Sequence, residues 1–265
     1  MKLRKALDKA NKEQREAPAQ PSPVTSSEEI VWEAPVYSES VTVELDPEKL
    51  AQNRCVCISH EAPELDAYKV LRTRIQQLTK DRGMNTIMVT SARPGEGKTT
   101  IAINLALTFS REFQQTVLLV DCDLKKQDIR KYLGFSSDRG LIDFLENDHL
   151  LKDIIIWPGI EKLTLISGGR TVSDSVELLG SPKMKKLVEE MKTRYKDRYV
   201  ILDVPALLNG ADAMAFAPLV DSIVMVVEKG STSLADVKKA VELLPQDKFL
   251  GFVLNDRCGE VILVK

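Results

Sequence analysis

The chain has 265 residues, of which 43% are hydrophobic and 29% are charged, and its formal net charge is −2. These values are typical of a globular protein, and the balanced charge predicts no nucleic-acid partner. The longest apolar runs, such as residues 222–227, are far shorter than the roughly 20 residues needed to cross a bilayer. The four scattered cysteines predict neither a disulfide scaffold nor a zinc site, and the basic N-terminus lacks the apolar stretch of a secretory signal.

The first sixty residues differ in composition from the rest. The first sixteen combine a weak helical repeat of Leu and Ala with six Lys and Arg side chains. This pattern fits either a frayed terminus or a short helix that docks on a partner or on an anionic membrane surface. Residues 17–48 contain seven acidic residues and no Lys or Arg, a composition that buries too little apolar surface to fold alone. We therefore expect a flexible tether over residues 1–60 and one folded domain over residues 61–265.

Helical and strand patterns alternate along the rest of the chain. The expected strands are short and apolar throughout, which is typical of a parallel sheet covered on both faces. The sequence therefore predicts an α/β fold with a doubly wound, mostly parallel sheet. The helices are expected at residues 66–80, 99–113, 182–196 and 234–244, and the strands at 86–90, 116–120, 163–166, 199–202, 222–227 and 250–254.

The most informative segment reads Ser-Ala-Arg-Pro-Gly-Glu-Gly-Lys-Thr-Thr and lies between an expected strand and an expected helix. That context is typical of a phosphate-binding P-loop, in which backbone N–H groups at a helix N-terminus surround the phosphates. Ala92 replaces the first glycine of the usual motif. Lys98 would reach the β- and γ-phosphates, and the Thr99 hydroxyl would bind Mg²⁺. The nucleotide-binding residues expected here are Pro94, Gly95, Glu96, Gly97, Lys98, Thr99 and Thr100.

Three aspartates follow two of the expected strands. Asp121 and Asp123 end one of them, and Asp203 ends another. Ligands of an open parallel sheet bind at the carboxyl ends of its strands, where carboxylates can hold Mg²⁺ directly or through water. These three aspartates, with Lys98, are the expected catalytic residues, although Asp123 could instead cap a helix.

The order of these motifs resembles the bacterial tyrosine kinases (BY-kinases) of capsule and exopolysaccharide loci. These kinases are P-loop ATPases related to the MinD- and ParA-like proteins, which have a deviant Walker A loop. The similarity covers residues 62–256 and includes the segments 118–126, 200–203, 140–145 and 176–182. The resemblance implies that Mg-ATP phosphorylates a tyrosine hydroxyl. Thr99 and Asp203 would organise Mg²⁺, Asp121 would either help to hold the metal or accept the tyrosine proton, and Asp123 would support Asp121. Asn255 would be either an adenine contact or a turn residue.

Several positions depart from the family pattern. Members usually carry a tyrosine-rich C-terminal tail, whereas here Tyr199 is the last of five tyrosines. Tyr37, in the acidic tether, is the best acceptor candidate, and Tyr68, Tyr132, Tyr195 and Tyr199 are expected to pack in the fold. Lys125 replaces an arginine of the second aspartate motif.

Two further features bear on assembly. The motif used for ring assembly reads Asp66-x-x-Lys69-x-x-Arg72, so it fits either a homo-oligomer contact or a solvated helix face. Arg93 occupies the place of the signature lysine of the related ATPases, and it is either an arginine finger or a solvated loop residue.

The resemblance implies a cytoplasmic, ATP-dependent protein-tyrosine autokinase that regulates exopolysaccharide or capsule assembly. Such a kinase would lie at the inner face of the membrane through a partner, a polysaccharide co-polymerase that activates it. The alternative is an ATP-driven assembly switch, like the MinD- and ParA-like ATPases, without productive tyrosine transfer. A small-molecule P-loop kinase is a third and weaker interpretation.

Overall fold

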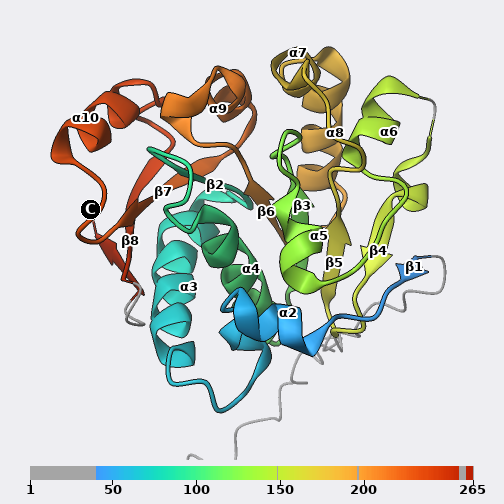
Figure 1. Ribbon diagram of the computed structural model, residues 1–265, viewed down its shortest axis with the longest axis horizontal. Coiled ribbons are helices and arrows are strands. Elements are labelled where there is room, and N and C mark those ends of the chain that lie inside the picture. Colours follow the sequence, from blue (N-terminus) through green and yellow to red (C-terminus); the bar gives the residue numbers. More distant parts are fainter. Residues whose placement is uncertain (1–39, 148, 196, 257–260, 265) are drawn as a thin grey trace, which may run out of the picture. The chain divides into compact units, whose positions relative to one another are not determined.

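The computed structural model describes residues 40–147, 149–195, 197–256 and 261–264 of the chain. Among these residues, nine strands form a single sheet in the order β1-β4-β5-β3-β6-β2-β7-β8-β9 (Figure 1). The five strands from β5 to β7 and their neighbour β8 are mutually parallel, and the antiparallel pairs lie toward the two edges. The strands are β1 (Val41–Thr42), β2 (Thr86–Ser91), β3 (Thr116–Asp121), β4 (Ile155–Trp157), β5 (Leu163–Ile166), β6 (Arg198–Asp203), β7 (Ser222–Glu228), β8 (Phe249–Asn255) and β9 (Val261–Val264).

The sheet is buried on both faces because helices cover each side. Successive residues of a strand point to opposite faces, and here they belong to two separate hydrophobic clusters. Val117 and Leu119 pack in one cluster, whereas Leu118 and Val120 pack in the other. The prediction of a doubly wound, mostly parallel sheet with helices on both faces is therefore confirmed. The α-helices are α2 (Pro47–Gln52), α3 (Leu65–Thr79), α4 (Lys98–Phe109), α5 (Asp128–Leu133), α6 (Leu141–Glu146), α7 (Ser175–Leu179), α8 (Pro182–Thr193), α9 (Asp212–Phe216) and α10 (Leu234–Glu242).

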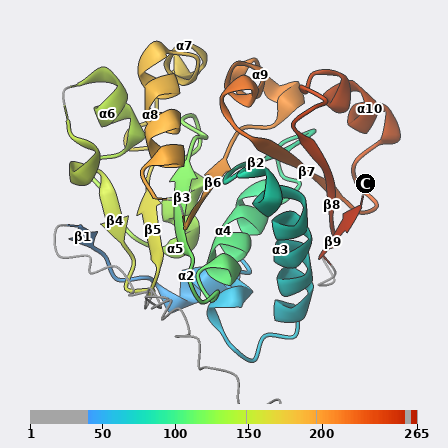
Figure 2. The ribbon, with the colours of Figure 1, turned by 180° about the vertical axis from the view of Figure 1, so that it is seen from behind.

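The longer helices form where their sequences favour them. α3 buries Leu71 and Ile75 at helical spacing, and the Ser181 side chain caps α8 by accepting the Met184 N–H. α4 ends at Phe109 instead of the expected residue 113, and the Phe113 side chain is 87% exposed. Figure 2 shows α3 and α4 side by side against the central strands. No helix in the described part of the chain is both long and apolar enough to span a bilayer.

The N-terminal boundary differs from the expected one. Residues 40–58 pack on the sheet domain, so the tether expected over residues 1–60 is wrong for this stretch. β1 pairs with β4, Asp46 caps α2, and Leu50, Cys55 and Cys57 are buried in the core. Glu44 and Glu48 are exposed while these few apolar side chains are buried, a distinction that average composition hides. The expected basic helix and Tyr37 lie outside the described residues.

Three of the four other tyrosines pack as expected. Tyr68 and Tyr199 are buried, and Tyr132 is half-buried. Tyr195 is 42% exposed, which contradicts the expectation that it packs in the fold. It follows the end of α8, where the Arg198 guanidinium lies 4.1 Å from its ring centroid. A cation–π contact at the surface therefore holds this ring instead of core packing.

Candidate nucleotide-binding and phosphoryl-transfer site

The P-loop joins the carboxyl end of β2 to the first residue of α4, as the sequence predicts. Gly95 and Gly97 both have a left-handed φ of 92°, a conformation that glycine adopts without a steric penalty. A Cβ atom at Gly97 would lie 2.2 Å from Asn255 Nδ2. A side chain at position 97 would therefore require the Asn255 side chain to move away from the loop.

Glu96 holds the loop against its neighbours. Its Oε2 accepts the Arg93 N–H (3.0 Å) and its Oε1 accepts the Thr232 hydroxyl (2.6 Å). Asn255 Nδ2 donates to the Glu96 carbonyl oxygen over 3.0 Å. The Glu96 side chain is buried, so its role in the structure is to brace the loop. Asn255 is the last residue of β8, not part of a turn, and it supports the same loop.

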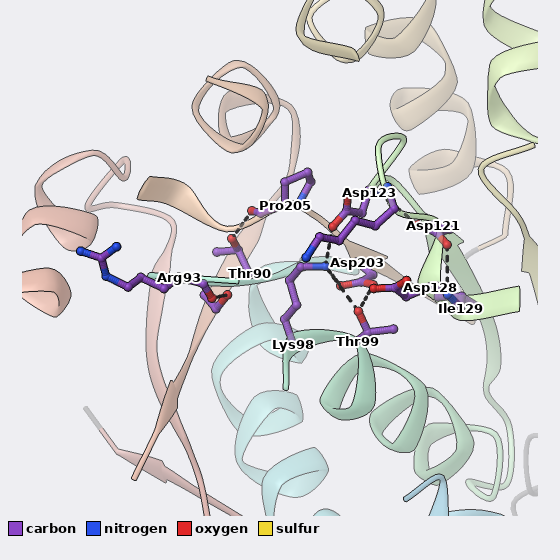
Figure 3. A network of polar contacts seen from close by, with 12 residues as sticks. Thr90, Arg93, Lys98, Thr99, Asp121, Asp123, Asp128, Ile129, Asp203 and Pro205 are labelled. Atoms are coloured by element: carbon purple, nitrogen blue, oxygen red, sulfur yellow. Dashed lines mark hydrogen bonds and ion pairs between the residues drawn. The ribbon is translucent and has the colours of Figure 1, made fainter. Parts of the chain in front are cut away.

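Lys98 lies among acidic side chains at the start of α4 (Figure 3). Its Nζ is 2.9 Å from Asp123 Oδ2 and 3.2 Å from Asp203 Oδ1. Thr99 donates its hydroxyl to Asp203 Oδ2 over 2.7 Å. Burial alone would lower the pKa of Lys98, but the charges of Asp203 and Asp123 outweigh it and raise that pKa. The lysine is therefore held as a cation at the helix N-terminus, where anions bind.

Asp121 is placed differently from the other two aspartates. It is fully buried, and its two oxygens accept the N–H groups of Asp123 (3.1 Å) and Ile129 (3.2 Å). Burial and the nearby charge of Asp203 raise the pKa of Asp121 well above its ordinary value. Burial also raises the pKa of Asp203, against the opposing effect of Lys98. Asp121 thus shapes the turn that presents Asp123, whereas Asp203 lies directly beneath Lys98 and Thr99.

A cavity of about 450 Å³ opens over this loop. The P-loop residues expected to bind nucleotide form part of its wall, namely Pro94, Gly95, Gly97, Lys98, Thr99 and Thr100, together with Asp123 and Asn255. Glu96, Asp121 and Asp203 lie behind this wall. The sequence reasoning missed a further group that completes the cavity, formed by Arg54, Val56, Tyr68, Lys126 and Tyr132. Arg54 and Val56 reach the cavity because residues 40–58 fold back onto the domain, which no local motif predicts.

The donor set fits a nucleotide with Mg²⁺. The start of α4 offers backbone N–H groups and the Lys98 ammonium for phosphate oxygens. The Thr99 hydroxyl and the carboxylates of Asp203 and Asp123 are the oxygen ligands that Mg²⁺ prefers. Thr99 and Asp203 already lie within hydrogen-bond distance of each other, so a single cation could contact both oxygen groups.

The residues that depart from the family pattern form contacts within the chain. Arg93 binds Asp236 of α10 through two hydrogen bonds of 2.8 and 2.9 Å, although its side chain is largely exposed. Lys125 Nζ lies 2.9 Å from Asp212 Oδ2. Asp212 also accepts the Ser175 hydroxyl, and the nearby donors lower its pKa despite its burial. These pairs tie the loops around the cavity to α9 and α10.

The basic residues of the expected assembly motif, Lys69 and Arg72, form two separate ion pairs. Lys69 pairs with Asp66 at 2.8 Å on the exposed face of α3. Arg72 is instead mostly buried, where it pairs with Glu112 and donates to the Thr108 carbonyl oxygen (2.9 Å). Arg72 therefore joins α3 to the end of α4 within one chain.

Comparison with known proteins agrees with this geometry. The AAA domain family matches residues 84–246. The tyrosine-protein kinase YwqD of Bacillus subtilis is 33% identical over 72% of this chain and 81% of its own length. The crystal structure of the chimerical protein CapA2B2 has a TM-score of 0.69 and 27% identity over 84% of this chain and 94% of that one. The septum site-determining protein MinD of Pyrococcus horikoshii, solved with Mg-ADP, has a TM-score of 0.53 and 26% identity over 64% of this chain and 70% of its own. The chain therefore belongs to the AAA domain family and, within it, to the bacterial tyrosine-protein kinases.

Proposed function

We propose that this kinase binds Mg-ATP over its P-loop and transfers the γ-phosphoryl group to tyrosine in the control of exopolysaccharide or capsule assembly. The observation that carries the proposal is the contact of Lys98 with Asp123 and Asp203 at the floor of the cavity. The Mg-ADP in the solved MinD structure supports the choice of nucleotide. The names of the curated relatives support the choice of acceptor.

Each residue of the site has a distinct role in this proposal. Lys98 holds the phosphates and offsets the negative charge that develops as the phosphoryl group moves. Thr99 and Asp203 hold Mg²⁺, which neutralises phosphate charge when bound. Asp123 faces the cavity, so we assign to it the acceptance of the tyrosine proton, one of the roles expected of Asp121. Asp121 orients the Asp123 turn through its hydrogen bond to the Asp123 N–H.

The acceptor oxygen and the proton can be followed through the reaction. The tyrosine hydroxyl oxygen forms a bond to the γ-phosphorus while the bond to the bridging oxygen of ADP breaks. The phenolic proton passes to the Asp123 carboxylate, and ADP leaves with the electron pair of the broken bond. This direct transfer needs no covalent intermediate on the chain, because positioning of the reactants and stabilisation of charge supply the catalysis.

The partner and the location belong to the same proposal. We propose that the kinase works at the inner face of the membrane by binding a polysaccharide co-polymerase that activates it. The solved chimera CapA2B2 supports pairing of such a kinase with a second protein. Self-association is also proposed. Tyr37 is the proposed acceptor on this chain, because it lies in the acidic segment before β1.

Intact-mass and phosphosite analysis after incubation with Mg-ATP tests this function. Wild-type protein is compared with Lys98→Met and with a matched control, Lys186→Met, which removes an exposed lysine of α8. Each protein is measured alone and with the cytoplasmic segment of the co-polymerase. Phosphotyrosine in the wild type and the control, but not in Lys98→Met, is the expected result. Lys98-dependent ADP release without any phosphotyrosine, even with the activator, would refute the transfer and favour an ATP-driven switch.

A further inference from the structure

Lys125 lies two residues after Asp123 and lines the same cavity. Its Nζ donates to Asp212 Oδ2 over 2.9 Å. The Asp212 side chain is only 3% exposed, whereas that of Lys125 is 39% exposed. Asp212 does not line the cavity. The pair therefore joins a cation in the cavity wall to a buried carboxylate behind that wall.

Asp212 is held from its other side by Ser175, the first residue of α7. The Ser175 hydroxyl donates to Asp212 Oδ1, and Ser175 is fully buried. Asp212 is itself the first residue of α9, and α7 contacts α9 (Figure 1). These helices follow the carboxyl ends of β5 and β6, the same edge of the sheet at which the P-loop lies. Lys125, Asp212 and Ser175 therefore form a continuous polar chain from the cavity to α7 and α9.

The backbone that carries Lys125 is fixed on both sides. Leu124 is fully buried, and its carbonyl oxygen accepts the Val172 N–H (3.3 Å). The Lys126 N–H donates to the Asp123 carbonyl oxygen (3.0 Å). Movement of the Lys125 ammonium must therefore come from the side chain, a flexible four-carbon stem that ends in a group with three donors.

The position of Lys125 in the sheet places it near the phosphate that is transferred. Lys98 contacts Asp123, from the same turn as Lys125, and Asp203, at the end of β6. A Cβ atom at Gly210, in the segment that joins β6 to α9, would lie 3.8 Å from Lys125 Nζ. In P-loop proteins the Mg²⁺ at the strand-terminal aspartate bridges the β- and γ-phosphates. Lys125 therefore lies at the strand end where the γ-phosphate distinguishes ATP from ADP.

The Lys125–Asp212 pair is of a kind that can exchange partners. An ion pair with a partly exposed lysine contributes little to stability. A phosphate oxygen offers the same ammonium a charge-assisted hydrogen bond to a more highly charged group. Asp212 would then keep the Ser175 hydroxyl but lose the cation that offsets its buried charge. Departure of Lys125 would therefore be felt at the first residues of α7 and α9.

We propose that Lys125 exchanges Asp212 for the γ-phosphate when Mg-ATP binds, and that Asp212 and Ser175 transmit this exchange to α7 and α9. The proposal rests on the nucleotide binding proposed above, and it makes Lys125 a residue by which the chain distinguishes ATP from ADP. Because Asp212 competes for the same ammonium, it lowers the affinity for ATP without lowering that for ADP.

Isothermal titration of the full chain with Mg-ADP and with Mg-AMP-PNP, a non-hydrolysable ATP analogue, tests the exchange. Lys125→Met should weaken the binding of Mg-AMP-PNP about tenfold and that of Mg-ADP less than about twofold. Asp212→Asn keeps an oxygen for Ser175 but removes the competing charge, so it should strengthen Mg-AMP-PNP binding about threefold. The matched control, Lys192→Met, removes the lysine of a comparable ion pair, with Asp221, outside the cavity wall. It should leave both affinities unchanged.

A double variant separates the exchange from a general effect of charge. In Lys125→Met protein, the further change Asp212→Asn should leave the ratio of the two affinities unaltered, because no ammonium remains to be released. A ratio that still rises would mean that Asp212 acts on the phosphates through its electric field alone, and would overturn the proposal. Lys125→Arg keeps the charge and should retain most of the discrimination that Lys125→Met loses.

Hydrogen exchange tests the connection to the two helices. In wild-type protein, exchange at residues 175–179 and 212–216 should be faster with Mg-AMP-PNP than with Mg-ADP, since Asp212 has lost its counter-charge. This difference should vanish in Lys125→Met. Equal exchange with both nucleotides in the wild type would mean that Asp212 had kept its partner, and would refute the proposal.

Failure of this inference and failure of the proposed function give different results. Nucleotide binding that is absent, or that is unchanged in Lys98→Met, contradicts the proposed function and this inference together. Equal losses of Mg-ADP and Mg-AMP-PNP affinity in Lys125→Met contradict only the exchange. A protein that discriminates between the nucleotides through Lys125, but transfers no phosphate to tyrosine with the activator present, would support the exchange and refute the kinase function.

Discussion

Lys98 Nζ and Asp123 Oδ2 lie 2.9 Å apart, and Asp203 approaches the same ammonium from the neighbouring strand. The chain thus surrounds its phosphate-binding cation with its own carboxylates. Breaking a buried ion pair by removing one partner is far more destabilising than removing both, because the remaining charge is left uncompensated. The stability of the nucleotide-free protein should therefore depend on Lys98 in a way that varies with pH.

We expect Lys98→Met to lose about 3 kcal/mol of folding free energy at pH 8, and less as the pH falls. Burial already raises the pKa of Asp203, and loss of Lys98 removes the charge that opposes this rise. A raised carboxyl pKa contributes stability that is complete below the unfolded value, near 3.8, and is lost as the pH rises through the folded value. Urea denaturation between pH 5 and 8 measures this trend, with Lys186→Met as the control. A destabilisation independent of pH would contradict the explanation.

Asp121→Asn should mainly lower stability, whereas Asp123→Asn should mainly lower catalysis. Both Asp121 oxygens accept backbone N–H groups. In Asp121→Asn the amide NH₂ would face one of these N–H donors, which should lower the folding free energy by about 1–3 kcal/mol. Asp123→Asn keeps an oxygen for the Lys126 N–H but loses its charge beside Lys98. Asp203 still offsets the Lys98 charge, so this variant should lose less stability than Asp121→Asn does, and it should lose phosphotransfer by about 100-fold.

Chemical denaturation and phosphotransfer assays of both variants distinguish the roles. Activity that falls more in a stable Asp121→Asn protein than in Asp123→Asn would restore Asp121 as the catalytic carboxylate. The proposed division rests on Asp123 lining the cavity, whereas the fully buried Asp121 does not line it.

The long apolar strands could be predicted from the sequence, whereas the short strands and short helices could not. Strands such as residues 116–121 are predictable because a continuous apolar run ends in an aspartate at the edge of the sheet. β1 and β4 have only two and three residues, and they form because β4 pairs with β5 and β1 pairs with β4. α5, α6, α7 and α9 have five or six residues each, too few for a helical repeat to appear.

The site shows the same division between local and distant determinants. The P-loop was predictable because one contiguous stretch carries Gly97, Lys98 and Thr99, with their chemistry in sequence order. Arg54 was not, because its place at the cavity depends on Asn104, 50 residues away. The sequence singled out Asn255 as a nucleotide contact. Its side-chain amide instead donates a hydrogen bond to the Glu96 carbonyl oxygen, and this contact forms only because the sheet brings β8 beside the loop.

Gly97→Ala should weaken nucleotide binding more than Gly95→Ala does. Both positions have a φ of 92°, so each alanine costs about 1 kcal/mol of backbone strain. A Cβ at Gly95 meets nothing within 4 Å, whereas one at Gly97 lies 2.2 Å from Asn255 Nδ2. The double variant Gly97→Ala with Asn255→Ala should regain affinity toward the level of Gly95→Ala. Titration with a fluorescent ATP analogue measures this, and equal affinities for the two single variants would argue against a clash with Asn255.

Asn104→Ala should release residues 54–58 from α4. The substitution leaves the Cys57 N–H and the Arg54 carbonyl oxygen without their shared partner, which costs about 2 kcal/mol. The better helix propensity of alanine returns less than 1 kcal/mol of this. Asn53→Ala is the matched control, because its amide donates to the Lys49 carbonyl oxygen in an exposed position. Hydrogen exchange should accelerate at residues 54–58 in Asn104→Ala alone, while the strands of the central sheet stay protected. Unchanged exchange there would mean that Leu50, Cys55 and the Arg111 contacts suffice to hold residues 54–58 in place.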